Sequence, residues 1–138
     1  MTFLRRVLYW EAVALALLGA ALVIAPGVLF VDVLDQAPHP DGAWMRIGGV
    51  QAIGIALLMV LVGQNVEDRW WWAWAFCVVF AGTATISVFN AAFGVPDGAS
   101  SLSWWLLGLI AVALAGMLLW AIGRAGIERP PDVQVGED

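Results

Sequence analysis

The chain of 138 residues has no lysine, one cysteine and one histidine, and only 12% of its residues are charged. Without a lysine amine, it cannot form a Schiff base with retinal or pyridoxal phosphate, nor a phosphate-binding loop of the Lys-bearing type. Cys77 alone excludes an intrachain disulfide or dithiol redox pair. His39 alone excludes an intrachain bis-histidine haem site or a zinc site of His and Cys ligands. The sequence therefore predicts no cofactor, with a metal shared between two copies as the open alternative.

Hydrophobic residues, in contrast, make up 62% of the chain. An average soluble domain is about 45–50% apolar and about 25% charged, and a chain this short has too little interior to hide the excess. Hydrocarbon is therefore the expected solvent for most of the molecule. The net charge is −5 and all six basic residues are arginine. Because no basic face is present, nucleic acid is not an expected partner.

Four apolar runs are long enough to cross a bilayer as helices, which takes about 20 residues each. They comprise residues 7–30, 44–63, 70–93 and 102–123. The connections between them are short, so successive helices should be antiparallel neighbours. The predicted fold is all-α, an integral membrane four-helix bundle formed by residues 1–123. A polar tail of residues 124–138 should follow it in a disordered state.

The placement of arginine predicts the orientation of this bundle, because positive residues stay on the cytoplasmic side of a membrane. With four crossings, five of the six arginines fall on one side: Arg5, Arg6, Arg69, Arg124 and Arg129. Only Arg46 falls on the other side. Both termini are therefore expected in the cytoplasm, and the protein is expected to be a multi-pass protein of the cell membrane.

Tryptophan and small residues add two further expectations. The nine tryptophans lie near the ends of the four runs, where indole rings anchor a helix at the membrane surface. Adjacent tryptophans point in different directions around a helix, so an anchoring belt is expected rather than an aromatic cage for a cation. Pro26 should kink or end the first helix. Rows of small residues predict close helix packing: Ala12, Ala16 and Ala20; Gly48, Ala52 and Ala56; Ala111 and Ala115.

Glu11 is the acidic residue within the first run. An ionisable group inside a membrane is expensive and is a functional hypothesis by default, here as a proton carrier or a ligand contact. A structural alternative is that its side chain reaches the membrane boundary or pairs with Arg69 or Arg124.

Five further polar residues are candidates for an outward-facing site. Thr83, Ser87 and Asn90 are spaced to share one face of the third helix. Gln51 lies at a similar depth in the second helix, and Arg46 lies near its start. We expect Arg46, Gln51, Ser87 and Asn90 to meet in a polar cavity that contacts an anion or a lipid headgroup. The alternatives are interhelical hydrogen bonds and, for Arg46, an ion pair with an aspartate of the first connection.

Two stretches, LRRVLYWEAVALALLGAALVIAPGVL and WMRIGGVQAIGIALLMVL, carry a family resemblance. Their basic start, the proline near the end of helix one and the arginine before Gly-rich apolar sequence resemble the DoxX-like group of small four-helix bacterial membrane proteins. The resemblance covers the first half of the chain and implies a location in the bacterial plasma membrane. Some members are described as accessory subunits of quinone-linked redox enzymes, so any redox centre would belong to a partner.

The leading functional prediction is a non-enzymatic accessory or scaffold subunit that binds lipid in the outward-facing polar cavity. Its expected partners are membrane lipids and either another membrane protein or a second copy of the chain. The alternative is a dimeric, proton-coupled small-molecule transporter using Glu11, similar to small multidrug-resistance transporters in its four helices and its glutamate in helix one. Catalysis is not expected, because the only acid–base grouping is His39 with Asp35 or Asp41 in a connection.

Overall fold

The computed structural model describes residues 1–33, 42–95 and 100–128, and within these ranges it contains helices and no strand. The four long helices are α1 (Thr2–Ile24), α2 (Ala43–Gln64), α4 (Ala73–Phe89) and α5 (Leu102–Glu128). Shorter helical turns adjoin them: η1 (Val28–Val33), α3 (Val66–Arg69), η2 (Trp70–Trp72) and η3 (Asn90–Gly94). Four helical stretches are long and apolar enough to cross a membrane: Thr2–Ile24, Ala43–Gln64, Val66–Gly94 and Leu102–Ile127. The predicted all-α class with four candidate spans is therefore confirmed.

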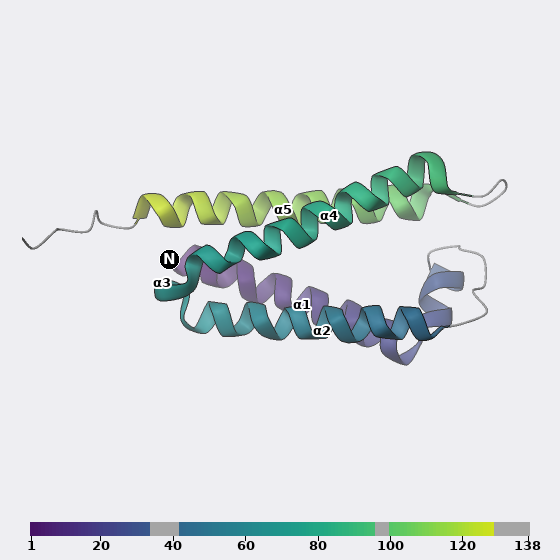
Figure 1. The fold of residues 1–138 in the computed structure, drawn as a ribbon, viewed down its shortest axis with the longest axis horizontal. Coiled ribbons are helices and arrows are strands. Elements are labelled where there is room, and N and C mark those ends of the chain that lie inside the picture. The colour runs from purple at the N-terminus through teal and green to yellow at the C-terminus, as the bar shows by residue number, and fades with distance from the viewer. Residues whose placement is uncertain (34–41, 96–99, 129–138) are drawn as a thin grey trace, which may run out of the picture.

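The long helices form two antiparallel hairpins (Figure 1). α1 packs along α2, and α4 packs along α5, while contacts between α1 and α5 join the two hairpins. The hairpins meet at the end that holds the start of α1 and the end of α5, which we call the closed end. They diverge at the opposite end, which holds the end of α1 and the start of α5 and which we call the open end.

The apolar core is concentrated at the closed end. Its largest fully buried apolar side chains come from the first half of α1, the last half of α2, the turn α3 and the last half of α5: Leu4, Leu8, Met59, Val66 and Leu118. Phe76 and Phe80 add the first half of α4. All four long helices therefore interlock at this end, and burial of these side chains fixes the two hairpins against each other.

Small residues bring the helices together within each hairpin toward the open end. A Cβ added to Gly49 would lie 2.6 Å from the Gly19 carbonyl oxygen, so the backbones of α1 and α2 are in contact there. In the second hairpin, a Cβ added to Gly108 would lie 3.5 Å from the Ser87 Cβ. Close approach of this kind is what small residues permit in membrane helices. Of the predicted rows of small residues, Ala12, Ala56, Ala111 and Ala115 are buried, whereas a Cβ at Gly48 would meet nothing within 4 Å.

The ends of the helices differ in part from the predicted runs. α1 begins at Thr2 and ends at Ile24, just before Pro26, as the proline predicts. α5 continues to Glu128, five residues beyond the predicted end of the bundle at residue 123. The remainder of the predicted tail, residues 129–138, lies outside the described residues, as do His39, Asp35 and Asp41.

An ion pair ties the start of α1 to the connection between the hairpins at the closed end. The Arg5 guanidinium donates hydrogen bonds of 2.7 and 2.9 Å to the two carboxylate oxygens of Glu67. Its Nε also donates to the Gly63 carbonyl oxygen at 3.0 Å, at the end of α2. Glu67 is 59% exposed, so this pair contributes at most about 1 kcal/mol to stability. Its main effect is to fix the position of α3 relative to α1.

Most tryptophan side chains face outward. Trp10, Trp44, Trp71, Trp72, Trp74, Trp105 and Trp120 are all exposed. Trp70 is partly buried against the core, and its indole Nε1 has no hydrogen-bond partner. Outward-facing indoles near helix ends are what the belt arrangement requires.

Candidate functional site

Glu11 lies inside the core rather than at its edge. Its side chain is 1% exposed, and neither carboxylate oxygen has a hydrogen-bond partner. It occupies the face of α1 that also holds Leu4 and Leu8, which places it among the apolar side chains of the closed end. Leu8 and Ala12 of α1 belong to the same buried core as Cys77 of α4.

The ion pair with Arg69 or Arg124, one of the structural alternatives for Glu11, does not form. Both arginines are exposed, and the Arg124 guanidinium lies over the Phe3 ring, 5.7 Å from its centroid. Arg69 ends the separate turn α3, which precedes the third predicted run, and its side chain is exposed at the closed end. Glu11 is therefore a buried carboxyl surrounded by apolar groups, which is costly unless something else binds it.

The burial of the Glu11 carboxyl without a partner should lower the stability of the fold. We expect Glu11→Met to raise the free energy of unfolding by about 1–2 kcal/mol, because it removes an unpartnered buried polar group while keeping an unbranched side chain of similar length. Glu11→Gln should gain less, since its amide remains unpartnered. Denaturant titration of the purified protein in detergent micelles measures both. A Glu11→Met protein less stable than the wild type would show that the carboxyl has a stabilising partner.

The predicted outward-facing polar cavity is not formed. Arg46 and Gln51 are exposed on α2, which makes few contacts with α4. Ser87 is 1% exposed and packs beside Gly108 of α5, within its own hairpin. Asn90 is partly buried where α4 passes into η3. These side chains are separated because α4 pairs with α5 and not with α2.

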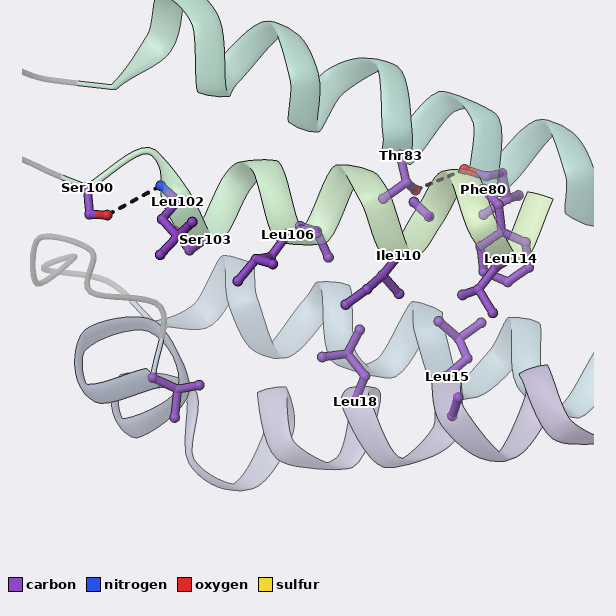
Figure 2. A pocket seen from close by; sticks show the side chains of 15 residues that line it. Leu15, Leu18, Phe80, Thr83, Ser100, Leu102, Ser103, Leu106, Ile110 and Leu114 are labelled. Atoms are coloured by element: carbon purple, nitrogen blue, oxygen red, sulfur yellow. Dashed lines mark hydrogen bonds between the residues drawn. The ribbon is translucent and has the colours of Figure 1, made fainter. Parts of the chain in front are cut away.

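An apolar cavity of about 620 Å³ lies instead between α1 and the α4–α5 hairpin. Figure 2 shows its walls: Leu15 and Leu18 of α1 stand opposite Leu106, Ile110 and Leu114 of α5. The volume is within the range of about 300–1,000 Å³ typical of small-molecule sites. Glycine contacts hold α1 against α2 and α5 against α4. The two hairpins therefore separate between the core and the open end, and the cavity lies in this space.

The cavity runs from the open end toward the core. At the open end of the bundle it is lined by Val33, Ser100, Leu102 and Ser103. The end nearest the core, which we call the floor, is lined by Leu15, Phe80 and Leu114. From Leu102 to Leu114 is about 18 Å along α5 at 1.5 Å per residue. This is close to half of the hydrocarbon core of a bilayer, which is about 30 Å thick.

Polar groups are few in this lining. Thr83 is the one predicted site residue among the lining residues. Its hydroxyl donates to the Val79 carbonyl oxygen at 2.8 Å, within α4. At the open end, the Ser100 hydroxyl accepts the backbone N–H of Leu102 at 3.3 Å. The cavity therefore suits an apolar chain with any polar group at the open end.

Among the residues that the structure describes, no group of three or more His, Cys, Asp or Glu side chains is placed to hold a metal ion. Comparisons with protein families, with curated proteins and with solved structures find no match for the chain. The cavity and the buried carboxyl of Glu11 are therefore the two features of the molecule that bear on its function.

Proposed function

We propose that the protein is a non-enzymatic, multi-pass membrane protein that holds one lipid chain between its two hairpins. The observation that carries this proposal is the apolar cavity of about 620 Å³ between α1 and α5. Its length matches the depth of one leaflet, and its serines lie at the end where a polar headgroup would sit. A protein of this kind would act as an accessory or scaffold subunit, with membrane lipid and a membrane protein as its partners.

The surface of the bundle supports placement in a membrane. Large apolar side chains are exposed along all four long helices, among them Leu17, Leu57, Val78 and Leu109. An exposed apolar surface of this extent favours lipid over water as the solvent. With the arginine distribution, we infer that the closed end is cytoplasmic and that the open end faces the outside.

Single-cysteine labelling tests this orientation. In a Cys77→Ala background, Thr2→Cys and Asn65→Cys report the closed end, whereas Ala43→Cys and Ser101→Cys report the open end. A membrane-impermeant maleimide added to intact cells should label the two open-end cysteines and should reach the closed-end cysteines only after lysis. Labelling of all four positions in intact cells, or recovery of the protein in the supernatant without detergent, would contradict the proposal.

A further inference from the structure

The unpartnered Glu11 belongs to the turn of α1 that precedes the floor of the cavity. Ala14, Leu15 and Leu18 of α1 line the cavity, and Glu11 precedes them on the same face of the helix. Leu15 is about 6 Å further along the axis of α1. Helical side chains lean toward the N-terminus, so the carboxyl is on the closed-end side of the floor.

The neighbouring helix α4 brings core residues to the same level. Cys77 is one turn before the floor residue Phe80 and lies in the same buried core as Leu8 and Ala12, which flank Glu11 in the sequence. Two of the three floor side chains, Leu15 and Leu114, are only partly buried. For the cavity to reach Glu11, a side chain of the floor such as Leu15 must change rotamer.

We propose that Glu11 anchors lipophilic primary amines in this cavity, with the nitrogen at Glu11 and the alkyl chain along α5. This inference rests on the proposed function, because the same cavity must accept an apolar chain. It adds a second class of ligand, since a lipid whose headgroup is at the open end leaves Glu11 unpartnered.

The hydrogen-bonding chemistry of the Glu11 carboxyl favours primary amines. A primary ammonium offers three N–H donors and no acceptor, which complements a carboxylate whose two oxygens both lack a donor. Hydrogen bonds between charged partners are about twice as strong as neutral ones, and the apolar surroundings strengthen them further. A fatty acid of the same chain length would place two carboxyl groups together and should be rejected.

Binding of matched alkyl probes tests the site. Dodecylamine and dodecanol are titrated into the protein in phosphatidylcholine nanodiscs, with empty nanodiscs as the blank. The wild type should bind dodecylamine more tightly than dodecanol by at least about tenfold, as expected for a charged hydrogen bond. Glu11→Gln should abolish that preference. Asp68→Asn, which neutralises an exposed carboxylate at the closed end, should keep it.

The outcomes separate the two proposals. Equal binding of both probes by the wild type, or an unchanged preference in Glu11→Gln, would overturn the amine site while leaving the lipid cavity intact. Failure of the wild type to bind either probe would also overturn the amine site. If lipid is absent from the purified protein as well, the proposed function fails with it.

Chemical labelling gives a second measurement that needs no variant. The hydrophobic reagent dicyclohexylcarbodiimide reaches carboxyl groups from within the membrane and should modify Glu11 in the wild type. Dodecylamine should lower the yield of the N-acylurea adduct at Glu11, because the bound amine either keeps the carboxylate ionised or captures the activated carboxyl as an amide, and dodecanol should not, as read by mass spectrometry of the peptide. Modification at the same rate with and without dodecylamine would contradict the amine site.

Discussion

Gly49→Ala should lower the free energy of unfolding by about 3 kcal/mol, at the upper end of the usual range for overpacking. The added methyl would lie 2.6 Å from the Gly19 carbonyl oxygen and 2.8 Å from the Val23 Cγ2. A backbone oxygen cannot move aside without displacing its helix, so α1 and α2 must separate at their crossing. Denaturant titration in detergent micelles measures the loss.

The adjacent glycine provides the matched control. A Cβ at Gly48 meets nothing within 4 Å, so Gly48→Ala should leave stability unchanged or raise it by up to about 1 kcal/mol through helix propensity. The two variants differ by one position and carry the same new methyl. Equal stability of the two proteins would show that the α1–α2 crossing does not depend on contact at Gly49.

The number of long apolar helices and the end of the first helix were predictable from the sequence. Both depend on long apolar runs and on the position of Pro26, and these local features need no knowledge of packing. The ends of the helices were harder to predict, because polar residues at the end of α5 continue the helix to Glu128. Ala12, Ala56, Ala111 and Ala115 of the predicted small-residue rows are buried, but the sequence did not show that Gly49, rather than Gly48, contacts α1.

Of the candidate site, only the single residue Glu11 could be predicted from the sequence. Glu11 could be identified because a carboxyl in an apolar run is unusual, but its burial without a hydrogen-bond partner could not be, since its position near the start of the helix suggested contact with the membrane boundary or an arginine. The predicted polar cavity does not form because it required α2 to pack against α4. Helix pairing is a property of the whole bundle, and here each helix pairs within its own hairpin. The leucines of the real cavity carry no sequence signal, since leucine fills most membrane helices.

Blocking the cavity should remove bound lipid, which is the second large effect that we expect. Leu18 and Ile110 line the cavity from opposite walls and are 40% and 56% exposed, so a larger side chain can be accommodated without disturbing the core. Leu18→Trp and Ile110→Trp would each place an indole ring in the space for the chain. Either variant should retain lipid at least about tenfold less than the wild type, which corresponds to about 1.4 kcal/mol.

Neighbouring leucines separate this effect from a general loss of stability. Leu17 and Leu109 are 68% and 66% exposed, adjoin the blocked positions, and do not line the cavity. Leu17→Trp and Leu109→Trp should therefore retain lipid as the wild type does. If these control variants lose lipid to the same extent, the bound lipid lies on the outer surface of the bundle and not in the cavity.

Native mass spectrometry of the wild-type protein, released intact from nanodiscs, is the most direct test of whether the two hairpins hold a lipid chain. We predict a species carrying one lipid that survives collisional removal of the surrounding lipid and that is lost in Leu18→Trp. A wild-type protein that appears only at its bare mass, under conditions that preserve its helical fold, would contradict the claim that the two hairpins hold a lipid chain.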